Sequence, residues 1–237
     1  MMSVRTRLDR FLSMTTGINR GAVRLMLAKG RVQVDGVTAR DIQQIVHQFS
    51  VITLDGTVLQ ENKPVYFMMN KPLGVVSATR DKKHKTVIDL MLPCDSSSLH
   101  IAGRLDFNTS GLLLLTNDGA WSRNLSSPEN RIKKYYRVTL EKPVMKEYVQ
   151  TFRAGIYFDY EGITTQPAEL TILGEYLAEI AVIEGRYHHI KRLFGHFQNR
   201  VLDLHRYRIG NLTLDSQLAL GQYRSLSENE IRDIVVS

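Results

Sequence analysis

The sequence has very little cysteine and no long hydrophobic run. Cys94 is the only cysteine in 237 residues, so no disulfide can form within the chain, and a reducing cytoplasm is the expected localisation. Cys94 follows Pro93 and precedes a serine run, which predicts a loop or core thiol and not a nucleophile. The apolar runs of the sequence, such as Leu112–Leu115, are far shorter than the roughly 20 residues that span a bilayer. The N-terminus lacks the apolar segment of a signal peptide, so we expect no membrane partner.

Several motifs of other enzyme classes are also absent. The glycine-rich loops that bind nucleotide phosphates do not occur, which removes support for nucleotide hydrolysis. The Gly-x-Ser-x-Gly motif of serine hydrolases is missing too. His188 and His189 are adjacent, so their side chains diverge in any regular structure, and no cysteine cluster joins them or His196. We therefore predict no metal site and no cofactor.

Positive charge is abundant instead. The formal net charge is +7 and the pI is about 9.5, a balance that favours nucleic acid as partner. A solvated basic face is the common interpretation of such charge. The first half of the N-terminal region nevertheless concentrates it, with only Asp9 opposing seven cations there: Arg5, Arg7, Arg10, Arg20, Arg24, Lys29 and Arg31. Arg20 and Arg24 lie four residues apart and share one helical face, an arrangement suited to phosphate contacts.

The first sixty residues predict a compact unit of two helices and a small sheet. Val4, Leu8, Phe11 and Leu12 have helical spacing. Asn19 is expected to cap a second helix, whose apolar side holds Ala22, Val23, Met26 and Leu27, and Gly30 is its expected C-cap. Residues 31–37 and 51–58 alternate with period two, and each contains an Asp-Gly turn signal.

The polar stretch Gln60–Pro64 marks a domain boundary, which gives a small domain at residues 1–61 and a larger one at residues 62–237. The second part is rich in strand candidates and poor in helices, so an α+β fold with a mainly antiparallel mixed sheet is expected instead of a doubly wound one. The strand candidates are residues 66–69, 74–77, 112–115, 136–140 and 178–183, and the helix candidates are residues 145–154 and 190–197.

The densest group of turn and charged residues surrounds Asp106. The apolar run Leu112–Leu115 separates two loops that contain glycine and aspartate, and a carboxylate on such a loop is held by a rigid scaffold yet reaches solvent. Aspartate in a loop commonly caps a turn instead, here with Asn108 or Thr109. Asp118 and Asp89 are competing acids, and composition does not choose among the three.

Two further segments combine cations with aromatic rings. Residues 131–141 carry basic residues before Tyr135 and Tyr136, and in a strand these rings face opposite sides, so at most one lines a given pocket. Cations that hold phosphate beside a ring that stacks on a base suit RNA, although half-buried strand tyrosines explain the pattern equally well. Residues 183–194 are also strongly basic, and a cation from them would keep a carboxylate ionised through charge pairing.

The first of two family resemblances concerns the N-terminal part. Arg7–Asp9 (RLD), Asn19–Ala22 (NRGA) and Gly30–Gly36 (GRVQVDG) follow one another in the order found in S4 RNA-binding domains, which the segment resembles. The resemblance implies that residues 1–61 bind RNA.

The whole chain resembles the bacterial pseudouridine synthases of the ribosomal small-subunit and large-subunit group that carry an N-terminal S4 domain. Four segments match motifs of that family in order: Asn70–Gly74 (NKPLG), Gly103–Leu113 (GRLDFNTSGLL), Lys134–Tyr136 (KYY) and Glu184–Arg192 (EGRYHHIKR). His188 is typical of the enzymes that act on small-subunit rRNA, whereas His189 departs from the glutamine expected there.

The resemblance implies that Asp106 is the catalytic carboxylate of an enzyme that converts a uridine in RNA to pseudouridine without a cofactor. It implies that Tyr136 packs against the target base and that Lys191 pairs with the aspartate. Arg104 is expected to help extrude the nucleotide from its stack. The remaining expected RNA contacts are Arg7, Arg20, Arg24, Lys29, Arg31, Lys71, Lys134, Arg186 and Arg192.

The expected partner is 16S rRNA in a small-subunit assembly intermediate, bound by a monomer. Two alternatives remain open at this point. The same chemistry on 23S rRNA or tRNA is one, although His188 favours the small-subunit target. A non-catalytic S4-type protein that assists ribosome assembly explains the charge and the N-terminal part, but it leaves the segments around Asp106 and Tyr136 without a purpose.

Overall fold

The computed structural model describes residues 5–91, 98–159 and 161–234, so Val4 and Cys94 lie outside the described residues. The chain divides into two compact units, Met1–Pro64 and Val65–Ser237. Among the described helices, none is long and apolar enough to cross a membrane.

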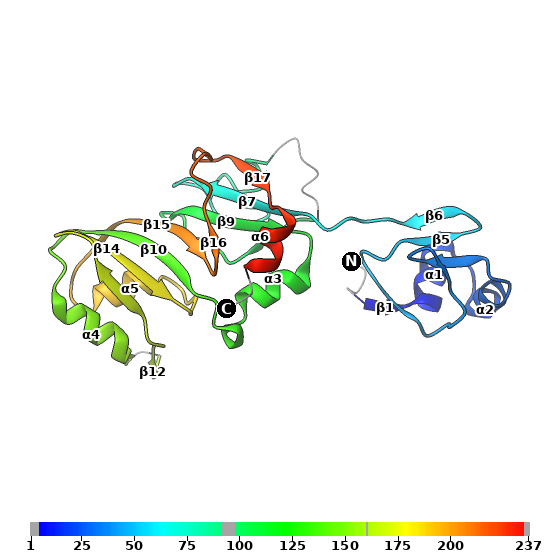
Figure 1. Ribbon diagram of the computed structural model, residues 1–237, viewed down its shortest axis with the longest axis horizontal. Coiled ribbons are helices and arrows are strands. Elements are labelled where there is room, and N and C mark those ends of the chain that lie inside the picture. The colour runs from blue at the N-terminus through cyan, green and yellow to red at the C-terminus, as the bar shows by residue number, and fades with distance from the viewer. Residues whose placement is uncertain (1–4, 92–97, 160, 235–237) are drawn as a thin grey trace. The chain divides into compact units, whose positions relative to one another are not determined.

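The N-terminal unit is a helix pair with a small antiparallel sheet (Figure 1). Asn19 caps the second helix, because its side chain accepts a hydrogen bond from the Ala22 amide at 2.9 Å. That helix ends one residue before the expected glycine: Lys29 is the C-cap, and Gly30 follows in the left-handed region at φ +69°. The elements are β1 (Arg5–Arg7), α1 (Leu8–Thr16), α2 (Arg20–Ala28), β2 (Val32–Val34), β3 (Val37–Thr38), β4 (Ile45–His47), β5 (Ile52–Leu54) and β6 (Thr57–Gln60).

Two Asp-Gly turns shape this sheet, as the sequence predicts. Asp35 and Gly36 join β2 to β3, and Asp55 and Gly56 join β5 to β6, all four with positive φ as a tight hairpin requires. The strand order is β3-β2-β5-β6, and β1 pairs separately with β4. One face packs on the helices through a buried apolar core made by Leu8, Phe11, Leu12, Val23, Leu27, Val32, Val34, Ala39, Val46 and Ile52.

The second unit is built on a long mixed sheet with the order β13-β14-β10-β15-β9-β7-β17. β15 runs parallel to β9, and the other neighbours along this order are antiparallel, which confirms the expected mainly antiparallel mixed sheet. Its elements are β7 (Tyr66–Lys71), β8 (His100–Ala102), β9 (Ser110–Thr116), α3 (Gly119–Ser126), η1 (Pro128–Asn130), β10 (Lys134–Leu140), α4 (Lys146–Ala154), β11 (Tyr157–Phe158), β12 (Ile163–Thr164), β13 (Glu169–Ile172), β14 (Leu177–Val182), α5 (His189–Gly195), β15 (Val201–Ile209), β16 (Leu212–Thr213), β17 (Tyr223–Ser225) and α6 (Glu228–Asp233).

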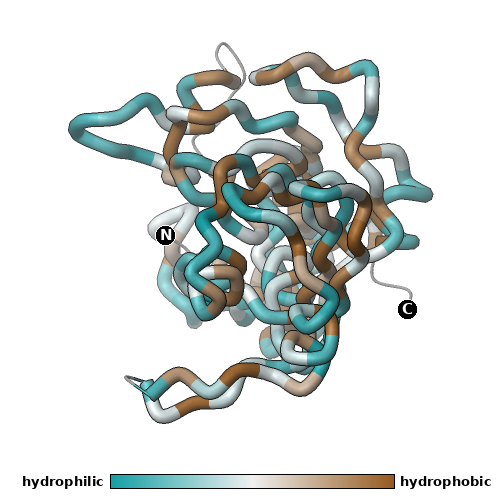
Figure 2. Tube along the Cα trace, turned by 90° about the vertical axis from the view of Figure 1, so that its left-hand side faces the viewer, coloured by the Kyte–Doolittle hydropathy of each residue, from teal (hydrophilic) through white to brown (hydrophobic). Residues whose placement is uncertain are grey.

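The strand β9 is buried on both faces, which explains its unbroken apolar run. Leu113 and Leu115 belong to a core that includes side chains of α4 and α5, whereas Leu112 and Leu114 belong to a second core that includes side chains of α3. Figure 2 shows hydrophobic residues, drawn brown, recurring through the interior of the trace, and a hydrophilic loop, drawn teal, projecting at the upper left. Strand β9 therefore gives the loop before it a rigid base.

Three parts of this unit differ from the sequence expectations. Residues 74–77 form no strand and contribute only an isolated bridge between Val76 and Thr86. The nine-residue strand β15 is central to the sheet although the sequence suggested no strand there. The short helices α3 and α6 were not anticipated either.

Candidate active site

Asp106 lies in the loop that joins β8 to β9, and a buried lysine holds that loop in place. Lys71, at the end of β7, has no exposed surface. Its Nζ donates to the carbonyl oxygens of Pro72 at 2.9 Å, Asp106 at 3.1 Å and Thr109 at 2.9 Å. The Thr109 amide also donates to the Asp106 carbonyl at 3.1 Å. The backbone around Asp106 is thus fixed from two sides, which leaves its side chain available.

The three competing acids have different surroundings. Asp118 is the N-cap of α3, where it accepts hydrogen bonds from two backbone amides and from the Tyr66 hydroxyl. Asp89 accepts from the Thr86 amide and hydroxyl, which lowers the pKa of its carboxyl. The Asp106 carboxylate accepts no hydrogen bond from any group within the described part of the chain, and it is 33% exposed. Only Asp106 of the three is therefore unused by the fold and open to a substrate.

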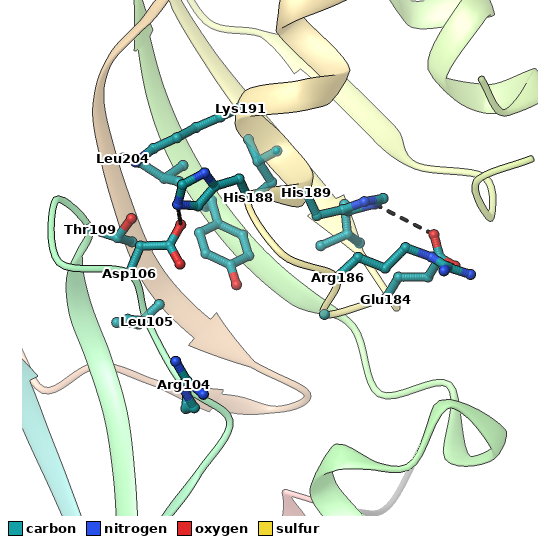
Figure 3. A pocket seen from close by; sticks show the side chains of 14 residues that line it. Arg104, Leu105, Asp106, Thr109, Glu184, Arg186, His188, His189, Lys191 and Leu204 are labelled. Atoms are coloured by element: carbon teal, nitrogen blue, oxygen red, sulfur yellow. Dashed lines mark hydrogen bonds and ion pairs between the residues drawn. The ribbon is translucent and has the colours of Figure 1, made fainter. Parts of the chain in front are cut away.

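His188 faces Asp106 across the pocket (Figure 3). Its Nε2 is 3.7 Å from Oδ2 of Asp106, and its backbone has the left-handed φ of +49° at the start of α5. His189 points the other way, with Nε2 3.6 Å from Oε2 of Glu184 (Figure 3). Burial lowers the pKa of His189. The strained backbone at His188 thus directs one imidazole to the carboxylate and the next into the protein.

Tyr136 and Arg206 form the floor of the site. Tyr136, on β10, is 8% exposed and lines the pocket. Arg206, on β15, is fully buried and donates from Nε to the Leu112 carbonyl and from a terminal nitrogen to the Gly103 carbonyl, both at 2.8 Å. Its other terminal nitrogen is 3.5 Å from the Tyr136 hydroxyl. One guanidinium therefore connects the loop between β8 and β9, the strand β9 itself and Tyr136.

Strand β9 approaches β15 closely beside Arg206. Gly111 has φ +105°, and a Cβ there would lie 2.2 Å from the Arg206 carbonyl oxygen. No larger residue fits without moving the backbone. The glycine thus permits the parallel pairing that carries Arg206 beneath the pocket.

The pocket has a volume of about 70 Å³ and unites residues from distant parts of the sequence. The Thr109 hydroxyl in its wall is buried and has no partner among the described groups. Lys191 lines the same pocket, half-buried, but makes no ion pair within the part of the chain that the structure describes. The lining residues are Arg104, Leu105, Asp106, Thr109, Tyr136, Val182, Glu184, Gly185, Arg186, His188, His189, Ile190, Lys191 and Leu204.

Two lysines predicted to contact RNA are buried, and that prediction is wrong for both in this structure. Lys71 is enclosed as described above, and burial lowers its pKa to about 8. Lys134 is 8% exposed and donates to the carbonyls of Ile132 and Ile183, each at 3.3 Å, and burial lowers its pKa to about 8 as well. Both ammonium groups are instead bound by backbone carbonyl oxygens in the interior.

The other predicted contacts in this unit have side chains that are exposed or partly exposed to solvent. Arg104 is exposed at the pocket. Arg186 is exposed and pairs with Glu184 at 2.9 Å. Arg192 lies elsewhere: it pairs with Glu161 at 2.7 Å and covers the Phe158 ring. It is not among the residues that line the pocket.

In the N-terminal unit, all five predicted contacts are exposed. Arg7 pairs with Asp9 at 2.9 Å, and Arg31 pairs with Asp55. The other three, Arg20, Arg24 and Lys29, have no ion pair with any described residue.

Sequence reasoning missed Arg206 as a part of the site. In the sequence it is one of several cations that follow residues 183–194, any of which could keep a carboxylate ionised, and Lys191 is favoured instead. The sequence held only a weak signal for it, because Leu204 and Arg206 are buried two residues apart but the next buried residue, Ile209, breaks the alternation.

Comparison with known proteins agrees with this geometry. The family model for RNA pseudouridylate synthases matches residues 65–196. The ribosomal small subunit pseudouridine synthase A of Pseudomonas aeruginosa is 48% identical over 226 residues, covering 95% of this chain and 98% of that protein. The protein of the same name from Escherichia coli is 40% identical and covers 97% of this chain and 100% of its own. A crystal structure of a pseudouridylate synthase superposes with a TM-score of 0.71 at 36% identity, covering 96% of this chain and 99% of that one.

The family match spans more than half of the chain and includes the Asp106 loop, Tyr136 and the start of α5. The relatives extend that likeness over nearly the full length of both chains. The chain therefore belongs to the RNA pseudouridylate synthase family.

Proposed function

We propose that this protein converts one uridine of 16S ribosomal RNA to pseudouridine, with Asp106 as the essential carboxylate. The observation that carries the choice of RNA is the nearly full-length similarity to proteins named ribosomal small subunit pseudouridine synthase A. The observation that carries the choice of residue is the Asp106 carboxylate, which lines the pocket and has no hydrogen-bond donor within the described part of the chain.

The reaction is an isomerisation. The bond between N1 of uracil and C1′ of ribose breaks, the uracil turns, a bond forms between C5 and C1′, the proton on C5 is lost, and N1 gains a proton. Nothing is oxidised or reduced, so the proposal requires no cofactor. Asp106 has three possible tasks, namely attack on C1′, attack on the base, or removal of the ribose 2′ proton. Each requires an ionised carboxylate beside the nucleoside, within reach of C1′, of the base or of the hydrogen on C2′.

The surrounding residues support these steps through position and charge. Tyr136 holds the free uracil by packing against it while it turns, and Arg206 fixes that ring from below through the contact with its hydroxyl. His188 and Lys191 contribute cations or donors on the side of α5. Arg104, exposed at the rim, is suited to contact the phosphate of the extruded nucleotide.

The N-terminal unit is proposed to act as an S4-like RNA-binding domain, residues 1–61, joined to a catalytic domain, residues 62–237. Arg20, Arg24 and Lys29, which form no ion pair with a described residue, supply phosphate affinity, whereas Arg7 and Arg31 are already engaged by Asp9 and Asp55. We further propose that the protein acts in the cytoplasm as a monomer on an assembly intermediate of the small subunit.

Mapping of pseudouridines in cells that lack this protein tests the proposal. Carbodiimide treatment followed by reverse transcription marks each pseudouridine as a stop. We expect one stop in 16S rRNA to disappear and to return when the wild-type gene is restored. Loss confined to 23S rRNA or tRNA would move the activity to the alternative substrate, and no loss at all would favour the non-catalytic assembly factor.

A further inference from the structure

Tyr187 is an aromatic side chain that the site described above does not use. Its exposure, 76%, is the highest among the large hydrophobic residues that the structure describes. An exposed aromatic ring of this size costs hydration free energy unless a partner covers it. It stands directly between Arg186 and His188, two residues that line the catalytic pocket.

One face of the Tyr187 ring is already occupied. It stacks on the His188 imidazole, with ring centroids 3.8 Å apart and an angle of 20° between the planes. His188 in turn faces the Asp106 carboxylate at 3.7 Å. Tyr187 thus stacks on His188, the residue that faces the catalytic carboxylate. The other, outer face of the Tyr187 ring is open to solvent.

The backbone holds this pair in position. His188 has φ +49°, a conformation that non-glycine residues adopt only where the surroundings enforce it, and it begins α5. Arg186, the residue before the tyrosine, is tied to Glu184 through its Nε. The rings are therefore set on a fixed turn beside an exposed guanidinium.

We propose that the outer face of Tyr187 stacks an unpaired base adjacent to the target uridine, while Arg186 contacts the neighbouring phosphate. The inference rests on the proposed function, because it requires single-stranded RNA at the Asp106 pocket. Aromatic stacking on a splayed base, with a cation for the backbone, is the usual way in which proteins hold unpaired RNA. This platform would fix the register of the RNA, so that the correct uridine enters the pocket.

A purely structural role makes a different prediction. If Tyr187 only props His188 toward Asp106, its loss would slow the chemical step and leave RNA binding unchanged. If it stacks a base, its loss weakens binding and raises KM, and kcat at saturating RNA stays within about twofold of wild type. The two roles thus separate in the kinetic constants.

The experiment uses the full chain carrying Asp106→Asn, which prevents turnover, and a fragment of 16S rRNA that contains the mapped uridine. The fluorescent base 2-aminopurine replaces the nucleotide on the 5′ side of the uridine in one RNA and on the 3′ side in another. We expect binding to quench one of the two, and Tyr187→Ala in addition to abolish the quenching and to weaken binding at least about tenfold. Tyr187→Phe is the matched control and should behave like the parent, because it keeps the ring.

Steady-state kinetics of Tyr187→Ala in the active enzyme complete the test. A reduced kcat with unchanged KM and unchanged quenching would overturn the proposal and assign the ring to His188. Because Tyr187 is exposed, the substitution is expected to leave folding intact, and the thermal midpoint checks this directly. Failure of the proposed function is recognised separately, because the wild-type enzyme would then form no pseudouridine in the same RNA.

Discussion

Replacement of Lys71 by methionine should change how the stability of the catalytic unit depends on pH. Methionine is an unbranched side chain only one atom shorter than lysine, and it carries no charge. In the wild-type protein, burial lowers the pKa of Lys71 from 10.5 to about 8, with a nearby cation, Arg206, acting in the same direction and Asp106 opposing it. The unfolded chain therefore holds a proton on this lysine between pH 8 and pH 10.5 that the folded protein has released.

The sign and size of the effect follow from proton linkage. Where the unfolded state binds more protons, stability rises with pH. The cost of the buried ammonium is largest at neutral pH, about 3 kcal/mol, and shrinks as pH rises through the window above 8. The wild-type protein should thus gain about 2 kcal/mol relative to Lys71→Met between pH 7 and pH 10. Groups common to both proteins titrate equally and cancel in the difference.

Urea unfolding followed by tryptophan fluorescence measures this difference. Trp121 is the only tryptophan in the chain and lies in α3 of the catalytic unit, so its signal reports that unit. Lys82→Met, which replaces an exposed lysine, is the control, and its offset from wild type should not vary with pH. An equally constant offset for Lys71→Met would refute the account of a buried ammonium that holds the Asp106 loop.

Three further outcomes are expected. Gly111→Ala should lower the free energy of unfolding by about 3 kcal/mol or more, because its Cβ would lie 2.2 Å from a carbonyl oxygen of β15. Gly195→Ala meets no atom within 4 Å, so urea unfolding should show almost no change for it. Replacing Arg20 and Arg24 together by glutamine should reduce the slope of log affinity against log salt by about 1.5 to 2 in filter binding, and an unchanged slope would exclude both from phosphate contact. Thr109→Val should slow single-turnover pseudouridine formation about tenfold, while Thr109→Ser should retain most activity. Because the Thr109 hydroxyl has no partner among the described groups, Thr109→Val should not lower the free energy of unfolding.

Local turn chemistry and apolar patterns made much of the fold predictable. Asn19 predicted the start of a helix, and the two Asp-Gly pairs predicted hairpins, because only a few residue types stabilise those backbone conformations. The run Leu112–Leu115 predicted a strand, and the structure shows that this strand is buried on both faces. These features depend on neighbours in sequence and need no knowledge of distant contacts.

Strand β15 escaped prediction because its buried positions are not all apolar. Arg206 lies inside the sheet, where carbonyl oxygens satisfy its guanidinium, so the hydrophobic alternation of an ordinary strand is broken. The prediction that Lys71 and Lys134 contact RNA failed for a related reason. A lysine with no acidic partner evident in the sequence suggests a surface residue. The carbonyl groups that accept from them come from segments far away in sequence.

The choice among three acids likewise required the structure. In the sequence Asp106, Asp118 and Asp89 were competing candidates, and only the order of family motifs favoured the first. In space, Asp118 and Asp89 are consumed by local hydrogen bonds, and the Asp106 carboxylate faces a pocket. The sequence alone does not show which of the three carboxylates already accepts hydrogen bonds from the backbone.

Pseudouridine formation by Asp106→Asn tests the central claim most directly. The variant keeps the shape of the side chain and removes its charge, and the matched control is Asp118→Asn, which removes the rival carboxylate while asparagine still caps α3. Both proteins are incubated with a 16S rRNA fragment, and the product is counted by carbodiimide mapping. We predict that Asp106→Asn binds the RNA normally and forms no pseudouridine, while Asp118→Asn remains active. Activity retained in Asp106→Asn would contradict the assignment of the catalytic carboxylate.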